Sequence, residues 1–286
     1  MFIGTEKLSH IYMPGTPYAT KALEEVSFSL DRGDFALLIG PSGSGKSTLI
    51  QHLNGLLKPS GGKVIFEDRE LGSDSVDLLA LRKRIGLVFQ MAEEHFFSET
   101  VYDEVAFAPR NLGLDEVKVE QNVKLALERV GLEWEVVHDR HPFQLSSGQK
   151  RLVALAAVLS LQPEVLILDE PTAGLDPGGR LHLFALLKSL NQQEGLTVLV
   201  CTHHMDEVAD LADSVLVLNR GKVIMSGPAH DIFARRQELN KLGLSLPEVT
   251  EVMHCLVAAG LPARTDIYSL EQARAEINSL KRRLEK

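Results

Sequence analysis

The chain has 286 residues and a formal net charge of −9, with 30 lysines and arginines against 39 aspartates and glutamates. This length suits one large α/β domain with an appendage, and the acidic balance argues against a general attraction to nucleic acid or anionic lipid. The longest apolar run, residues 152–159, is far shorter than the roughly 20 residues that cross a bilayer. The N-terminal residues lack a secretory pattern and the two cysteines cannot build a disulfide framework, so we expect a cytosolic protein without a membrane span.

A glycine-rich segment near the N-terminus carries the first chemical motif. An apolar run at residues 35–39 predicts a buried strand, and residues 47–57 have the pattern of a helix. The segment between them fits the phosphate-binding pattern GxxxxGK[ST], in which backbone N–H groups surround phosphate oxygens. We predict that Lys46 contacts the β and γ phosphates of a nucleotide and that Ser47 offers its hydroxyl to Mg²⁺. A glycine turn that only caps a helix is the competing interpretation. The predicted nucleotide-binding residues are Gly40, Pro41, Ser42, Gly43, Ser44, Gly45, Lys46, Ser47 and Thr48.

Two acidic residues follow a second apolar run, residues 165–168, which predicts a central strand of a parallel sheet. Asp169 is predicted to hold Mg²⁺ through coordinated water, and Glu170 to polarise the attacking water as a general base. Asp176 follows in the next loop and is expected near the same phosphate. An isolated acidic pair that merely starts an exposed loop is the alternative.

Three further side chains are candidates because of their places at strand ends. Gln90 ends an apolar run, residues 85–89, and its amide could reach Mg²⁺ or water; a solvated glutamine is the alternative. His203 follows the apolar run 196–200, where an imidazole could hydrogen-bond the γ phosphate; we prefer it to the neighbouring histidine, against the alternative of a polar loop. Tyr12 could stack on adenine, although Tyr18 is also available.

The sequence LSSGQ at residues 145–149 opens a long, nearly apolar helix that should be buried. The N-terminus of this helix is a second potential phosphate acceptor. The phosphates of one ATP are already expected at the N-terminus of the helix that follows the glycine loop. The second helix end must therefore serve a different anion or the nucleotide of another subunit.

With these motifs in this order, the chain resembles the ATP-binding cassette (ABC) ATPases over about residues 3–230. The matching motifs are Walker A at 40–48, the Q-loop Gln90, the signature at 145–149, Walker B at 165–170, the D-loop at 173–176 and the H-loop His203. The resemblance implies an α/β fold: a P-loop NTPase core with a parallel central sheet, an N-terminal antiparallel β subdomain, an inserted helical subdomain at about 92–162 and a helical C-terminal extension.

The resemblance also implies a head-to-tail dimer in which two ATP molecules lie between Walker A of one subunit and the signature of the other. The signature residues expected to bind nucleotide in this way are Ser146, Ser147, Gly148 and Gln149. Ser147 stands where the family signature LSGGQ usually has a glycine. Its Cβ and hydroxyl could weaken one composite site or be tolerated, and we favour tolerance.

Several segments are similar to a narrower group, the ATPases of energy-coupling factor (ECF) transporters: residues 12–23, 93–114 and 141–149. This similarity implies a motor subunit at the cytoplasmic face of the membrane, which couples ATP hydrolysis to uptake of a vitamin or metal ion. Its expected partners are a second ABC ATPase, the same or related, a transmembrane coupling subunit and a substrate-binding membrane subunit. Residues 94–104 are then the docking region, with a plain acidic loop as the alternative.

Other ABC proteins remain alternatives to the ECF assignment. An ATPase of a conventional importer or exporter would have the same motifs. A non-transport ABC protein acting on DNA or ribosomes would usually show a coiled-coil insertion, two cassettes or a basic surface, and the sequence shows none of these.

The tail is expected to form a C-terminal extension, residues 235–286, after an ATPase domain at 1–234. Pro247 should lie near the start of a helix with an apolar stripe. Ser269 and Gln272 have capping-box spacing and precede another apolar seam. ECF ATPases have a comparable extension that contributes to pairing, so we predict that removing residues 265–286 weakens dimerisation. Packing of the seam onto the chain's own ATPase domain is the alternative.

Overall fold

The structure is a computed structural model, which describes residues 1–71, 77–202, 205, 209 and 211–284. His203, for which a role was predicted, lies outside the described residues. Within the described part of the chain, no helix is long and apolar enough to cross a membrane.

The N-terminal strands form an antiparallel sheet in the order β2-β1-β4-β5. Its strands are β1 (Ile3–Tyr12), β2 (Thr20–Leu30), β4 (Gly61–Phe66) and β5 (Arg69–Glu70). In β2, Val26, Phe28 and Leu30 are buried or half-buried and alternate with the exposed residues Ser27 and Ser29, as expected for a sheet with one covered face. The predicted antiparallel subdomain is therefore confirmed.

The second sheet has the order β10-β9-β3-β8-β7-β6, with parallel pairing throughout except between β10 and β9. Its strands are β3 (Phe35–Ile39), β6 (Ile85–Val88), β7 (Val165–Asp169), β8 (Thr197–Cys201), β9 (Ser214–Asn219) and β10 (Lys222–Pro228). Every residue of β3, β7 and β8 is buried, because helices or the antiparallel sheet cover both faces of these strands. Because the strands are parallel, their carboxyl ends lie along one edge of the sheet. The last residues of β3, β6 and β7, which are Ile39, Val88 and Asp169, therefore lie at that edge.

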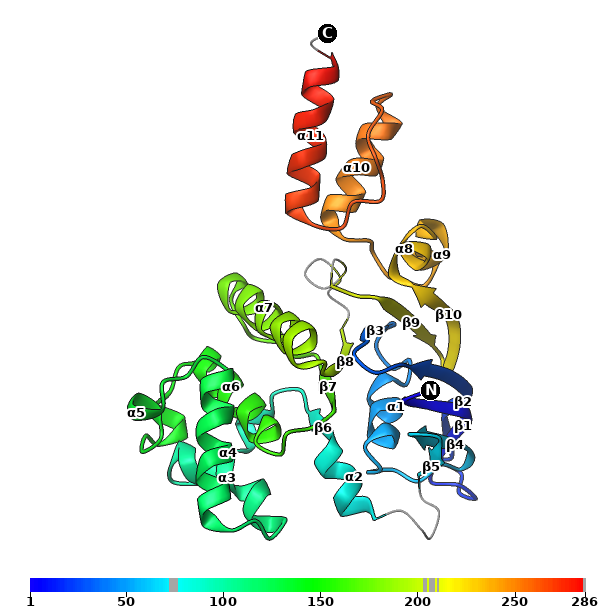
Figure 1. Cartoon of the computed structure of the whole chain (residues 1–286). Helices are drawn as coiled ribbons and strands as arrows, with labels where there is room; N and C mark the ends of the chain where they lie inside the picture. The colour runs from blue at the N-terminus through cyan, green and yellow to red at the C-terminus, as the bar shows by residue number, and fades with distance from the viewer. Residues whose placement is uncertain (72–76, 203–204, 206–208, 210, 285–286) are drawn as a thin grey trace.

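Helices fill the chain between β6 and β7 and lie together on one side of the molecule, across the parallel sheet from β1, β2 and β4 (Figure 1). They are η1 (Ala92–His95), α3 (Val101–Asn111), α4 (Glu116–Arg129), α5 (Trp134–Val137), η2 (Pro142–Gln144) and α6 (Ser147–Leu159). This arrangement confirms the inserted helical region. The exact subdomain bounds of 92–162 stay a prediction.

Three predicted element boundaries were wrong. The helix expected at 47–57 is α1 (Lys46–Leu53); it stops because Asn54 caps it and Gly55 adopts a φ of 69°. The strand expected at 196–200 begins one residue later, because the Leu196 carbonyl accepts from the Asn191 amide in the preceding turn. The strand expected at 85–89 ends at Val88.

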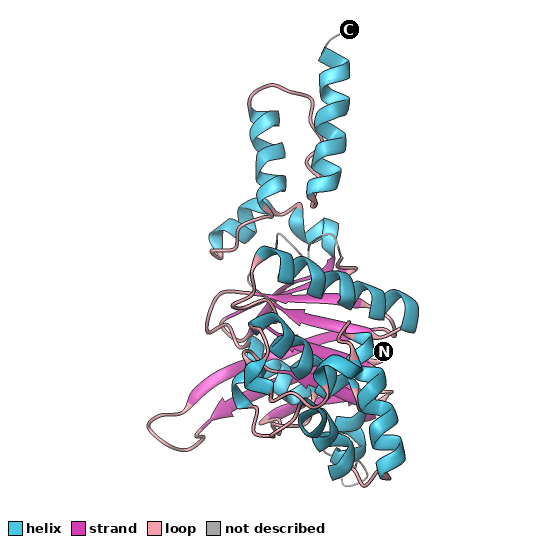
Figure 2. Ribbon diagram, turned by 90° about the vertical axis from the view of Figure 1, so that its left-hand side faces the viewer, coloured by secondary structure: helices cyan, strands magenta, loops and turns pink. Residues whose placement is uncertain are grey.

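The remaining helices are α2 (Leu78–Arg84), α7 (Pro177–Glu194), α8 (Ala229–Phe233), α9 (Arg236–Lys241), α10 (Glu248–Ala258) and α11 (Leu270–Leu284). The last two form a hairpin that projects from the body of the molecule (Figures 1 and 2). They bury Met253, Ile267 and Ala273 in a small core of their own, whereas the main core extends along the chain to Leu246. In the apolar seam predicted after Ser269, Leu270 is exposed, whereas Ala273 and Leu280 are buried. The division at residue 234 stays a prediction.

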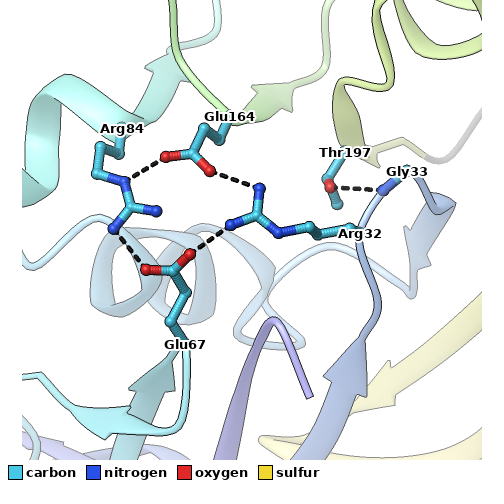
Figure 3. A network of polar contacts seen from close by, with 6 residues as sticks. All are labelled: Arg32, Gly33, Glu67, Arg84, Glu164 and Thr197. Carbon is cyan, nitrogen blue, oxygen red and sulfur yellow. Dashed lines mark hydrogen bonds and ion pairs between the residues drawn. The ribbon is translucent and has the colours of Figure 1, made fainter.

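A closed ring of ion pairs joins the two sheets at the edge opposite the strand ends named above (Figure 3). The guanidinium of Arg32 lies between Glu67 and Glu164, and that of Arg84 contacts the same two carboxylates. Glu67 follows β4, Arg84 ends α2 and Glu164 directly precedes β7. The ring therefore fixes the starts of β6 and β7 relative to the antiparallel sheet.

Candidate functional site

Strand β3 leads directly into the glycine loop, which ends where α1 begins at Lys46. A Cβ on Gly40 would lie 2.1 Å from the Leu218 carbonyl oxygen, and one on Gly45 would lie 2.7 Å from that of Ala22. Gly45 also has a φ of 105°, which side chains rarely adopt. These two glycines are needed because the loop passes against neighbouring backbone.

The loop faces a cavity of about 560 Å³. Residues of three predicted motifs line it together: the glycine loop from Ser42 to Thr48, Gln90, and the pair Asp169 and Glu170. A neighbouring cavity of about 620 Å³ shares Ser42, Lys46, Gln90 and Glu170, and adds Gly40 and Pro41. The structure thus brings the predicted Walker A, Q-loop and Walker B residues to one place.

The polar groups in this place suit a triphosphate and a cation. The Lys46 ammonium donates to the carbonyls of Gly40 at 2.8 Å and Pro41 at 3.3 Å, and the Ser47 hydroxyl donates to Asp169 Oδ2 at 2.8 Å. The Ser44 hydroxyl is buried and has no hydrogen-bond partner among the described residues. Buried donors without partners and adjacent hard oxygen ligands fit a phosphate group and Mg²⁺, respectively.

Burial raises the pKa of the Asp169 carboxyl above its ordinary value, although the hydrogen bond from Ser47 opposes this shift. The charge of Glu170 adds to the increase and the charge of Lys46 reduces it. A cation bound between Ser47 and Asp169 would favour the ionised carboxylate. The residues present therefore fit the predicted Mg²⁺ site.

Glu170 has an unusual backbone conformation at the end of β7. Its φ of 44° lies in the left-handed region, and its N–H donates to the Cys201 carbonyl at 2.9 Å. This conformation costs about 1–3 kcal/mol for a residue with a side chain, and such strain clusters at functional sites. It places Glu170 on the wall of both cavities. The structure thus brings this predicted base to the loop that would hold the phosphates.

Tyr12 is the tyrosine that reaches the cavity. Its hydroxyl lies 3.1 Å from Thr48 Oγ1, and its side chain is 40% exposed, whereas Tyr18 is 79% exposed and lines neither cavity. Tyr12 also packs edge-on against His10. This placement supports Tyr12 over Tyr18, and stacking on adenine stays a prediction.

A buried histidine pair behind Tyr12 was not found from the sequence. His52 Nε2 lies 3.1 Å from His10 Nδ1, and the other ring nitrogen of His52 lies 2.7 Å from the Thr48 carbonyl. Burial, the largest cause, lowers the pKa of His52, and the charge of His10 lowers it further. The pair joins β1 to the helix that follows the phosphate loop. No local motif could have signalled this contact, because the two residues are distant in sequence.

The signature residues, 145–149, lie outside both cavities. Ser146 caps α6: its hydroxyl accepts from the Gln149 N–H at 3.2 Å, and its own N–H donates to the Gln149 side chain at 3.1 Å. Ser147 is exposed, Gly148 is half-buried, and no residue of 145–149 lines either cavity. Asp176 caps α7 by accepting from the Gly179 N–H at 3.0 Å and also lies outside both cavities.

A second feature of the site was also not found from the sequence. Residues 243–245, which follow α9, line the cavity of about 620 Å³ together with Lys46 and Glu170. Leu244 and Leu246 are buried in the main core and hold this segment in place. The start of the tail therefore forms part of the wall around the phosphate loop.

Fold and cavity together define the class of protein: a P-loop nucleotide-binding protein with two acidic residues at the carboxyl end of β7, which β8 separates from β3 in the sheet. Comparison with known proteins agrees. The ABC transporter family matches residues 23–173. An energy-coupling factor transporter ATP-binding protein, EcfA2 of Clostridioides difficile, is 47% identical over 278 residues, which cover 97% of this chain and 96% of that protein.

Solved structures give the same answer. The structure of cbiO1 from Clostridium perfringens, described as part of the ABC transporter complex cbiONQ, aligns with a TM-score of 0.74 at 38% identity over 88% of this chain and 98% of that one. The dimeric ATP-binding cassette MJ0796, bound to ADP and Pi, aligns with a TM-score of 0.68 at 26% identity over 80% of this chain and 99% of that one. The chain belongs to the ABC transporter family, among the ATP-binding proteins of ECF transporters.

Proposed function

We propose that this chain is the ATP-hydrolysing motor subunit of an ECF-type importer for a vitamin or metal ion, at the cytoplasmic face of the membrane. One observation carries the proposal. Residues of Walker A, Gln90, Asp169 and Glu170 surround one cavity, while the signature residues 145–149 lie outside it. A subunit that shares its nucleotide with another subunit is expected to have one phosphate-binding helix end at the cavity and a second helix end away from it.

The chain's own side chains account for nucleotide binding. Lys46 exchanges its neutral carbonyl acceptors for phosphate oxygens, which form stronger, charge-assisted hydrogen bonds. Ser47 and Asp169 would hold Mg²⁺, which when bound would neutralise charge on the phosphates. Ser44 finds a partner for its buried hydroxyl. Tyr12, on the same cavity wall, provides a face for the base.

Hydrolysis requires a group that accepts a proton from water. Glu170 has this role, because it lines both cavities and follows the strand that ends in Asp169. Gln90 lines the same cavities and orients the water or the cation. Closure of a head-to-tail dimer, with a second copy or a related ATPase, places the partner's signature against the phosphates and excludes bulk water.

The segment after Gln90 has features of a docking surface for the transmembrane coupling subunit. Phe97 and Phe107 are both exposed and form an edge-to-face pair with ring centres 4.8 Å apart. The Glu104 carboxylate fixes the segment by accepting the N–H groups of Phe97 and Ser98 at 3.1 Å and 3.0 Å. A rigid, exposed aromatic pair suits an apolar helix of a membrane partner.

Replacement of Glu170 tests the proposal. Glu170→Gln should bind ATP with Mg²⁺ but hydrolyse it about 100- to 10,000-fold more slowly, because the proton acceptor is lost. ATP should then hold the variant as a closed dimer in light scattering. Glu164→Gln is the matched control, with the same substitution at the opposite end of β7, and should keep its turnover.

Near-normal turnover by Glu170→Gln would remove Glu170 from the role of base. Full turnover by a strictly monomeric protein would overturn the shared site. Purification from membranes in mild detergent, with partners identified by mass, tests the transport assignment: an ECF coupling subunit should accompany the chain. A conventional transporter's membrane domains in its place would contradict it.

A further inference from the structure

Arg151, in the second turn of α6, has a fully buried cationic side chain. Its side chain is 3% exposed, and its ion-pair partner Glu93 is 14% exposed. Arg151 Nη2 lies 3.1 Å from Glu93 Oε1 and also donates to the Ala173 carbonyl oxygen at 2.8 Å. Arginine is almost never fully buried unless its charge is paired, so the contacts of Arg151 decide why it is there.

The contacts of Arg151 join three segments that the nucleotide site needs. Glu93 belongs to η1, which follows Gln90 after a single intervening residue. Ala173 lies between Glu170 and Asp176. Arg151 itself lies on the helix whose first residues carry the signature. One guanidinium thus contacts the Q-loop side, the Walker B side and the signature helix at the same time.

The energetics of this pair argue against a purely stabilising function. Arg151 Nε and Nη1 and Glu93 Oε2 are buried without a hydrogen-bond partner among the described residues. Burial lowers the pKa of Arg151, and Glu93 offsets only part of this effect. A partly satisfied buried ion pair adds little stability compared with apolar residues of similar volume. The two N–H groups of Nη2 nevertheless have fixed directions in the planar guanidinium, so they can hold Glu93 and the Ala173 carbonyl at fixed positions.

We propose that Arg151 is a positioning residue, which fixes the segment after Gln90 and the Glu170–Asp176 turn relative to the signature helix, so that hydrolysis depends on it. The inference rests on the proposed function. Among the described residues, the hydrogen bond and ion pair of Arg151 go to Ala173 and Glu93 and not to the phosphate loop, so we expect its loss to leave nucleotide binding in place. It sets the geometry of the groups that act on water and of the helix offered to the partner subunit.

Three variants of the full-length chain test the proposal, in the dimeric state that hydrolyses ATP. Arg151→Met leaves the Glu93 carboxylate buried and unpaired, so both the melting temperature and kcat should fall. The double variant Arg151→Met/Glu93→Leu removes both charges and should recover the melting temperature. Its kcat should nevertheless stay about 10- to 100-fold low, as expected for misplaced catalytic groups.

Arg151→Lys keeps a positive charge beside Glu93 but lacks the planar guanidinium, whose Nη2 also reaches the Ala173 carbonyl. It should melt near the wild-type temperature with a lowered kcat, and the KM for ATP should stay within about twofold in all three variants. The control is Arg129→Met/Glu194→Leu, which removes a 2.9 Å pair between α4 and α7 that contacts none of these segments. The control should keep wild-type kcat.

Two results overturn the role of Arg151: wild-type kcat in the double variant, or wild-type kcat in Arg151→Lys. Recovery of kcat together with melting temperature in the double variant would show that the pair serves folding alone. The proposed function is tested separately from the role of Arg151. A wild-type protein that binds ATP with Mg²⁺ but shows no turnover, alone or with its membrane partners, contradicts the motor function whatever the variants do.

Discussion

Glu164→Gln removes the carboxylate charge that lies between two arginines in the ion-pair ring (Figure 3). The substitution keeps the size and shape of the side chain, so it isolates the charge. Arg32 keeps Glu67 as a partner, and so does Arg84. The ring opens into a chain, and the start of β7 loses its link to the antiparallel sheet. We expect the folded state to lose stability while the protein keeps its fold.

The size of the effect follows from exposure. The side chain of Glu164 is 32% exposed, that of Arg84 36% and that of Arg32 56%, so water screens these pairs substantially. Partly exposed ion pairs contribute about 0.2–1 kcal/mol each, and Glu164 takes part in two of them. We expect the free energy of unfolding to fall by about 1 kcal/mol. For a chain of this size, this lowers Tm by about 2–4 °C.

The assay is thermal unfolding at pH 7 in low and high salt. The difference in Tm between wild type and variant should shrink in about 1 M salt, where the screening length falls to about 3 Å. Glu6→Gln is the matched control, because Glu6 makes a single exposed pair with Lys63 outside the ring. It should change Tm by less than Glu164→Gln does.

The pH dependence has a definite sign. The hydrogen bond from Arg84, followed by that from Arg32, holds the pKa of Glu164 below its ordinary value of 4.5. Because the folded pKa is the lower one, the ring's stabilisation is present above pH 4.5 and is lost as the pH falls through the folded pKa. The Tm difference between wild type and Glu164→Gln should therefore close in acid. An equal Tm at pH 7 in low salt would refute the reasoning.

Three other predictions concern the site and the tail. Burial lowers the pKa of His52, so stability present above its ordinary value of 6.5 is lost as the pH falls through the folded pKa; His52→Gln should flatten the fall of Tm between about pH 7 and 5, and an unchanged slope would contradict this. Ser147→Gly should leave turnover equal or higher, because Ser147 is exposed and caps nothing; lower turnover would show that its hydroxyl contributes. Removal of residues 265–286 should weaken dimerisation, and an unchanged dimer in light scattering would count against a pairing role.

Motifs whose conformation depends only on neighbouring residues were predictable from the sequence. The glycine loop is set by the conformations of Gly40 and Gly45, and the start of α6 by the reciprocal bonds of Ser146 and Gln149. Both patterns are contained within a few residues. The end of α1 was placed too late because apolar periodicity continues past Leu53, whereas Asn54 and Gly55 decide where the helix stops.

Contacts between distant segments were not predictable. Glu93 and Arg151 are far apart in the sequence, and each has the appearance of an ordinary charged residue. The same holds for the tail segment 243–245 beside the phosphate loop. The apolar stripe of the last helices was visible, but periodicity does not specify a partner. The structure shows that Met253 and Ala273 cover each other within the hairpin.

Gly148 provides the strongest argument for a shared site. A Cβ on Gly148 would meet nothing within 4 Å, and its φ is not in the left-handed region, so neither crowding nor backbone conformation within this chain requires a glycine there. Glycine in a helix costs about 1 kcal/mol relative to alanine, so the chain gives up stability at this position. In the proposed head-to-tail dimer, a phosphate of another subunit's nucleotide would approach the first turn of α6, and Gly148 would offer it a surface without a side chain. On this proposal, the reason for the glycine lies outside the subunit that carries it.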